Sequence, residues 1–113
     1  MRTFFYALIS IMSVVGVSAG FSNLERVTLA DNASQLYAKN CASCHGKDGS
    51  AHTFKARLNH ARNLTDSDWQ NRVSDERIFN SIVNGKGKMP PFGKKLSDQQ
   101  IDSLVTYVRS LKK

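Results

Sequence analysis

Cys41-Ala42-Ser43-Cys44-His45 is the stretch of sequence from which the fold and the chemistry of this chain can be worked out. Two cysteines separated by two residues lie about one turn apart in a helix, so their sulfurs can reach two substituents on one edge of a planar ring. His45 follows directly, where its imidazole can bind a metal at the centre of that ring. This spacing is typical of covalent haem attachment. The sequence therefore predicts Cys41 and Cys44 as thioether anchors and His45 as an iron ligand.

Three other uses of the two cysteines stay open at this point. They can form a plain disulfide, or a thioredoxin-like redox motif, although the βαβ pattern that accompanies such a motif is absent. A zinc site made of both cysteines with His52 and His60 has the right ligand number. However, the two histidines are further apart than the roughly three to five intervening residues usual in such sites. The predicted export of the chain favours haem over all three.

The first nineteen residues have the layout of a secretory signal peptide. Arg2 gives a positive start, Phe4–Val17 is an almost uninterrupted apolar run, and Val17-Ser18-Ala19 places small side chains before a cleavage point. The alternative is a retained membrane anchor, but the apolar run has 14 residues, whereas a spanning helix needs about 20. We therefore expect export, cleavage after Ala19 and a location in the periplasm.

The predicted mature chain is a small basic protein, with a polar lead-in over 20–31 and one domain over 32–113. A domain of this size buries only about 60–65% of the surface of its unfolded chain, so a large planar cofactor would complete its thin core. Lys and Arg outnumber Asp and Glu by 16 to 9 in the full sequence, and by 15 to 9 once Arg2 is removed, which favours anionic partners. The lysines are scattered without interleaved aromatic residues, which argues against nucleic acid.

Apolar periodicity indicates helices and essentially no strands. We expect helices over Asp31–Asn40, after Thr65, over Asp75–Val83 and over Ser97–Leu111. The expected N-terminal caps are Ser74, Thr65 paired with Asp68, and the capping box of Ser97 with Gln100. Between Gly46 and Asn63 we expect a long irregular segment, of the kind that wraps a ligand or carries function. The predicted fold is all-α, with about four helices packed around one covalently bound haem.

Met89 is the predicted sixth ligand of the iron. It is the one methionine that remains after the signal peptide is removed, and it lies in Gly85-Lys86-Gly87-Lys88-Met89-Pro90-Pro91. The glycines permit a tight turn, and the prolines stiffen the backbone directly after Met89. The alternatives are a methionine that only fills the core, or His52 or His60 as the ligand. Pairing histidine with methionine favours ferrous iron and raises the reduction potential.

With these motifs, the chain resembles the class I cytochromes c of the short bacterial, single-haem kind, over about residues 33–111. The resemblance implies that the helix before the haem motif crosses the C-terminal helix, with Ala33 and Tyr37 packed against Tyr107. It also implies that a backbone carbonyl near Arg57 accepts a hydrogen bond from His45. The family usually has a proline in that segment, and Lys55–Leu58 has none. Trp69 would pack at the lower edge of the haem.

The resemblance further implies that redox partners with acidic faces dock beside the methionine loop. Four lysines bracket this loop: Lys86, Lys88, Lys94 and Lys95. Such docking is fast and weakens with salt. The alternative is that these lysines are ordinary solvated charges.

The resulting prediction is a soluble, exported, monomeric electron carrier and not an enzyme. It would pass single electrons between respiratory or photosynthetic complexes, from a quinol-oxidising complex or dehydrogenase to an oxidase or reductase. Two other functions remain open. One is a haem enzyme or sensor in which Met89 is displaceable, and the other is the haem subunit of a larger oxidoreductase.

Overall fold

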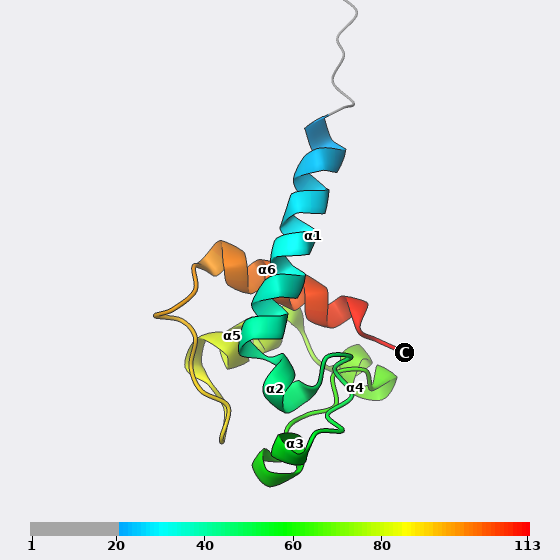
Figure 1. Cartoon of the computed structure of the whole chain (residues 1–113), viewed down its shortest axis with the longest axis vertical. Helices are drawn as coiled ribbons and strands as arrows, with labels where there is room; N and C mark the ends of the chain where they lie inside the picture. The colour runs from blue at the N-terminus through cyan, green and yellow to red at the C-terminus, as the bar shows by residue number, and fades with distance from the viewer. Residues whose placement is uncertain (1–20) are drawn as a thin grey trace, which may run out of the picture.

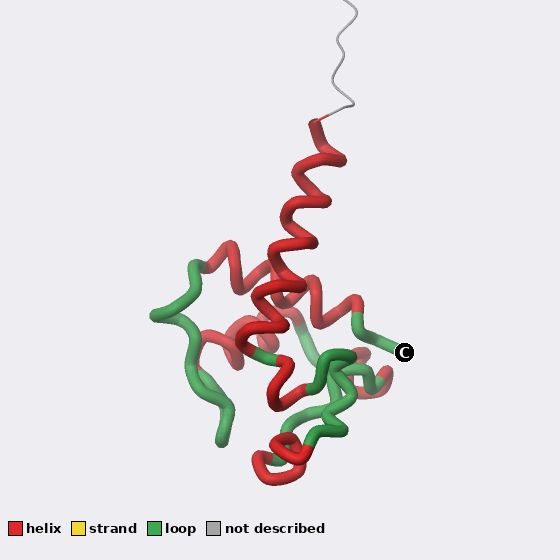
Figure 2. Tube along the Cα trace, viewed as in Figure 1, coloured by secondary structure: helices red, strands yellow, loops and turns green. Residues whose placement is uncertain are grey.

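Six helices make up the fold of residues 21–113, which are the residues that the computed structural model describes (Figure 1). They are α1 Phe21–Asn40, α2 Ala42–His45, α3 Phe54–Asn59, α4 Ser67–Arg72, α5 Asp75–Asn84 and α6 Asp98–Ser110. Over this range there is no strand (Figure 2), and the only β-type pairing is an isolated bridge between Lys86 and Met89. The all-α prediction is confirmed. The predicted signal peptide, residues 1–19, lies outside the described residues.

The crossing of α1 and α6 is the centre of the core (Figure 1). Ala33 and Tyr37 of α1 are 3% and 1% exposed, and the Tyr37 ring lies 4.9 Å from that of Tyr107, centroid to centroid. The small side chain of Ala33 lets the two backbones approach closely. The packing of Tyr37 against Tyr107 is therefore confirmed, and Ala33 is buried on the same helix. Most of the remaining buried apolar side chains come from α5, α6 and the segment between them: Ile78, Ile82, Phe92, Ile101, Leu104, Val105 and Val108.

Helices α5 and α6 begin and end close to where the sequence predicts. The Ser74 hydroxyl accepts a hydrogen bond from the backbone N–H of Arg77 at 3.2 Å. Ser97 and Gln100 form the predicted capping box, with the Ser97 N–H donating to Gln100 Oε1 at 2.9 Å and the Gln100 N–H donating to Ser97 Oγ at 3.2 Å. Each cap satisfies amide groups that the first turn of a helix leaves unpaired.

Three local predictions are wrong. Helix α1 already includes Phe21, the first described residue, ten residues before Asp31, because the sequence from Phe21 to Asn40 contains no glycine or proline to stop a helix. The N-cap of α4 is Asp66, whose carboxylate accepts from the Trp69 N–H at 3.1 Å, and not Thr65. The segment expected to be irregular contains α3, of which Ala56 alone is buried. An apolar period cannot reveal a helix with so little core contact.

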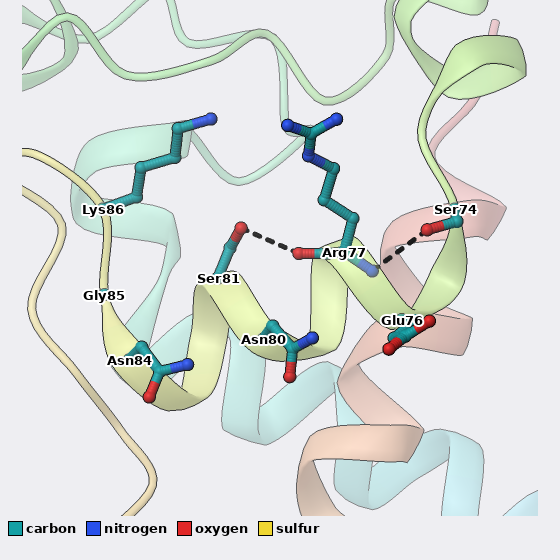
Figure 3. Close-up of a pocket in the computed structure, with 8 residues that line it drawn as sticks. All are labelled: Ser74, Glu76, Arg77, Asn80, Ser81, Asn84, Gly85 and Lys86. Atoms are coloured by element: carbon teal, nitrogen blue, oxygen red, sulfur yellow. Dashed lines mark hydrogen bonds between the residues drawn. The ribbon is translucent and has the colours of Figure 1, made fainter.

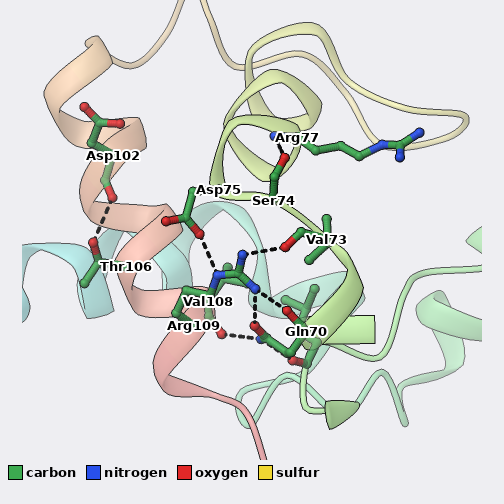
Figure 4. Close-up of polar contacts among 10 residues, drawn as sticks. Gln70, Val73, Ser74, Asp75, Arg77, Asp102, Thr106, Val108 and Arg109 are labelled. Atoms are coloured by element: carbon green, nitrogen blue, oxygen red, sulfur yellow. Dashed lines mark hydrogen bonds and ion pairs between the residues drawn. The ribbon is translucent and has the colours of Figure 1, made fainter. Parts of the chain in front are cut away.

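Arg109, on α6, ties down the junction between α4 and α5 (Figure 4). Its guanidinium donates to Asp75 Oδ1 at 2.6 Å, to the carbonyls of Gln70 and Val73 at 2.6 Å each, and to Gln70 Oε1 at 2.9 Å. The buried Gln70 amide in turn donates to the carbonyls of Leu64 and Val108, both at 2.8 Å. This network fixes α4 against the C-terminal helix. No helix of the described residues is long and apolar enough to cross a membrane.

Candidate functional site

The two cysteines stand one turn apart at the junction of α1 and α2. The Cys41 N–H donates to the Tyr37 carbonyl at 2.8 Å, and the His45 N–H donates back to the Cys41 carbonyl at 3.0 Å. Both cysteines are free thiols that border one cavity, so the structure does not adopt the disulfide. Burial, and to a smaller extent the neighbouring Cys44, raises the pKa of the Cys41 thiol to about 11.

His45 borders the same cavity, and one of its ring nitrogens is engaged by the backbone. Nδ1 lies 2.9 Å from the carbonyl oxygen of Arg62. A carbonyl can only accept, so Nδ1 carries the proton and Nε2 has a lone pair available for a metal. The prediction that a backbone carbonyl near Arg57 accepts from His45 is therefore wrong, because Arg57 lies inside α3. The acceptor belongs to the segment that comes after that helix.

Met89 reaches the cavity from a loop that is fixed at both ends. Lys86 and Met89 exchange two backbone hydrogen bonds, of 3.1 and 3.0 Å, and the Phe92 N–H donates to the Ile82 carbonyl at 2.9 Å. Gly85 permits the turn: its φ is +73°, and a Cβ there would lie 2.5 Å from the Met89 carbonyl oxygen. The structure thus brings Cys41, Cys44, His45 and Met89 to one cavity from segments far apart in sequence.

The cavity has a volume of about 650 Å³ and walls suited to a flat apolar ring with acidic substituents. Its apolar lining includes Tyr37, Leu64, Trp69, Val73, Ile78, Phe92 and Val108. Among the described residues, no carboxylate lines the cavity, and five cationic side chains do: Arg62, Arg72, Arg77, Lys86 and Lys88. Haem carries two anionic propionates, which this excess of positive charge can balance. The residues present therefore fit haem c.

A shallow polar depression adjoins the cavity on the outer face of α5 (Figure 3). Arg77 and Lys86 belong to both hollows, and in Figure 3 their charged ends point to the same side. The other lining residues are small or polar, and one hydroxyl, that of Ser81, donates to the Arg77 carbonyl at 2.8 Å. The depression holds neither a cysteine nor a histidine, and its two cations serve the rim of the larger cavity.

The two remaining histidines are placed differently. His60 borders the cavity at the C-terminal cap of α3, whereas His52 does not line it. Within residues 21–113 no three side chains of the His, Cys, Asp and Glu types come together as a metal-binding group. The zinc alternative therefore has no geometric support among the described residues.

Sequence reasoning missed two neighbours of the haem motif. Asn59 Nδ2 lies 3.6 Å from Cys44 Sγ, and the Thr53 hydroxyl, which caps α3, donates to the Cys44 carbonyl at 3.0 Å. Together they hold α3 against α2. The one available signal for the Thr53 cap of α3 was a threonine followed by the apolar residue Phe54. This pair is too common in sequences to predict a helix start.

An all-helical domain with these four side chains around one cavity defines a c-type cytochrome. A profile of the family described as "Cytochrome C oxidase, cbb3-type, subunit III" matches residues 28–108. The chain belongs to this family of cytochrome c domains, and it is a class I cytochrome with one covalently bound haem c.

Two kinds of curated protein are similar to the chain. Cytochrome c6 of Gloeothece citriformis is 34% identical over 107 residues, which cover 89% of this chain and 90% of that protein. The cbb3-type oxidase subunit FixP of Azorhizobium caulinodans is 35% identical over 83 residues, but these are 73% of this chain and only 27% of FixP. Among solved structures, the KustC0563 c-type cytochrome is 39% identical with a TM-score of 0.67, covering 72% of this chain and 98% of that one.

Proposed function

We propose that this chain is an exported, soluble cytochrome that carries single electrons between larger redox proteins. The observation that carries the proposal is the placement of Met89: a fixed turn brings its thioether to the cavity that His45 borders. If His45 and Met89 both held the iron, little would have to move when an electron enters or leaves. Haem c supplies an iron that alternates between the ferrous and ferric states.

Each site residue has a distinct task in this proposal. Cys41 and Cys44 would form the thioethers, and His45 Nε2 and the Met89 sulfur would hold the iron. The thioether favours the ferrous state, while the Arg62 carbonyl fixes the tautomer and orientation of His45. The arginines and lysines of the cavity wall balance the propionates. The tightly packed Tyr37, 1% exposed, closes the cavity towards α1 and keeps water out.

Export is proposed from the first nineteen residues alone, and a monomeric domain over 32–113 from the size of the chain. The positive start at Arg2, the apolar run Phe4–Val17 and the small residues before Ala19 support cleavage and a periplasmic location. The mature protein would then meet its partners outside the cytoplasm.

The proposed docking surface has an apolar centre and a basic rim. Phe54 and Leu58 on α3 are 75% and 55% exposed, and at a spacing of four they share one helix face. Lys88 donates to the Leu58 carbonyl at 2.8 Å, which joins α3 to the methionine loop. Exposed cations lie on the two joined segments and after them: Lys55 and Arg57 on α3, Lys86 and Lys88 in the methionine loop, and Lys94 and Lys95 further along the chain. A redox protein with an acidic rim around an apolar spot complements this surface.

The docking surface can be tested with two electron acceptors. Hexacyanoferrate is a small anion and needs no apolar contact, whereas a purified cbb3-type oxidase is a protein partner. We expect Phe54→Ser with Leu58→Ser to slow oxidation by the oxidase and not by hexacyanoferrate. Neutralising Lys86, Lys94 and Lys95 to Gln should flatten the salt dependence of the oxidase reaction. Equal rates for all variants would remove this surface from the proposal.

The ligand role of Met89 is tested by the visible spectrum and by carbon monoxide. In Met89→Ala the features of methionine ligation should disappear while the haem stays covalently attached, and the ferrous protein should bind carbon monoxide rapidly. The wild type should bind it slowly and incompletely at neutral pH. Rapid, full binding by the wild type would instead favour an enzyme or sensor with an open iron site.

A second candidate is the haem subunit of a larger oxidoreductase. The match to FixP favours it, because this chain corresponds to about a quarter of that oxidase subunit. Purification of the native protein decides between the two. A free monomer supports the carrier, and co-purification with a membrane oxidase supports the subunit.

A further inference from the structure

The carbonyl that accepts from His45 Nδ1 lies in a short segment between α3 and α4. Backbone hydrogen bonds hold this segment on either side of Arg62: the Ala61 N–H donates to the Ala56 carbonyl at 2.9 Å, and the Leu64 N–H donates to the Gly49 carbonyl at 2.8 Å. Between these two points there is no proline to restrict the backbone. The position of the Arg62 carbonyl therefore depends on what else holds Arg62.

The side chain of Arg62 lies over the ring of Trp69, with 5.9 Å between Cζ and the ring centroid. This is within the range of a cation–π contact. The backbone of Trp69 is held at both of its polar groups. The Trp69 N–H donates to Asp66 Oδ1 at 3.1 Å, and the Trp69 carbonyl accepts from the Val73 N–H at 3.0 Å. The next residue, Gln70, is 4% exposed and bonded to α6.

We propose that the contact of Arg62 with Trp69 positions the carbonyl that accepts from His45, so that Arg62 is a positioning residue for the iron ligand. The proposal rests on the proposed role of His45. A well-aligned Nδ1–H···O=C bond makes the imidazole a stronger electron donor, which stabilises ferric iron and lowers the reduction potential. Loosening the carbonyl weakens this bond and raises the potential.

Arg62 also borders the cavity, so a second role has to be separated from this one. If its charge simply balanced a propionate, removing it would favour the ferric state and lower the potential. Loss of the Trp69 ring would admit water to the cavity, and this would also lower the reduction potential. The sign of the shift therefore distinguishes positioning from both charge balance and exclusion of water.

The experiment compares variants of the haem-loaded protein. Arg62→Gln and Trp69→Leu remove the contact, whereas Arg62→Lys and Trp69→Phe retain a cation or a ring. Arg72→Gln is the matched control, because Arg72 is a second exposed arginine that borders the cavity. Two quantities are measured: the reduction potential, and the exchange rate of the His45 Nδ1 proton by NMR of the ferric protein.

We expect the potential to rise in Arg62→Gln and to fall in Arg72→Gln. The Nδ1 proton should exchange about two to five times faster in Arg62→Gln, the range that an exposed cation–π contact supports. Exchange should stay close to wild type in Arg62→Lys, Trp69→Phe and Arg72→Gln. If Trp69→Leu fails to bind haem, Arg62→Gln alone is sufficient to test the proposal.

The proposal is wrong if Arg62→Gln and Arg72→Gln lower the potential alike with unchanged Nδ1 exchange. It is also wrong if Arg62→Lys exchanges as fast as Arg62→Gln. A wild-type ferric protein whose His45 Nδ1 proton shows no paramagnetic shift would contradict the ligand role of His45 instead. Failure of the proposed function and failure of this inference therefore give different results.

Discussion

The α5–α6 pair and the segment 46–65 form two sides of the same site and are held in different ways. The helix pair is fixed by buried apolar side chains, among them Ile101 and Leu104, which are 0% and 1% exposed. In the segment 46–65, Ala56 and Leu64 are the buried apolar residues. Specific hydrogen bonds and two glycines with positive φ, Gly46 and Gly49, give the segment its path. The comparison indicates that burial sets the stability of the protein, whereas polar contacts set the orientation of His45, the proposed iron ligand.

The largest effect is expected from Leu104→Ala in the helix pair. The change removes a fully buried side chain from the core between α1 and α6, so it should cost about 2–5 kcal/mol of unfolding free energy. Guanidinium denaturation of the haem-loaded protein measures this loss. Gln99→Ala, at an exposed position of the same helix, should change little. If Leu104→Ala lost less unfolding free energy than the variants in segment 46–65, burial in the helix pair would not set the stability of the protein.

Arg109→Leu tests the junction between the two regions. It leaves the carboxylate of Asp75, two backbone carbonyls and the buried Gln70 amide oxygen without their donor, which should cost about 2–3 kcal/mol. Arg109→Lys keeps the charge but loses the planar fork, so an intermediate stability is expected. If thermal unfolding showed both variants to be as stable as the wild type, the network would be dispensable.

Gly49→Ala tests the backbone of the segment 46–65 itself. Gly49 has φ of +78°, and a Cβ there would lie 2.8 Å from Leu111 Cδ1. Strain of this kind costs about 1–2 kcal/mol. It should also shift the Gly49 carbonyl, to which Leu64 donates. Gly87→Ala is the control, since φ there is +59° but a Cβ would meet open space. Equal losses would show that the contact with Leu111 is unimportant.

The smallest effects come from two matched helix caps. Ser97→Ala and Thr53→Ala each remove a hydroxyl that caps one helix, so each should cost about 1 kcal/mol. Thr53 also donates to the Cys44 carbonyl. Only Thr53→Ala should therefore alter the NMR resonances of His45. Similar spectra for the two variants would mean that the tie between α3 and α2 does not reach the ligand.

The difference between the α5–α6 pair and the segment 46–65 also explains which features could be predicted from the sequence. Helices α5 and α6 were predictable because their caps and apolar periods are local, and the haem motif is five consecutive residues. Met89 was predictable as a candidate by elimination and by its glycine- and proline-containing loop. Arg62 was not, because its carbonyl meets His45 through the path of a loop, and neither residue type nor spacing encodes that meeting. Helix α3 was missed because only Ala56 faces the core.

Tyr37 has a consequence for how the protein folds. Its ring packs on Tyr107 of the last helix, while its hydroxyl donates to the carbonyl of Gly46, directly after His45, at 2.8 Å. Closing the chain between its first and last helices is entropically costly and slow compared with forming each helix. Since one side chain makes both contacts, we expect the turn beyond His45 to reach its final form only when the two ends of the domain meet. The proposed iron ligand would then be completed by the same late step that closes the fold.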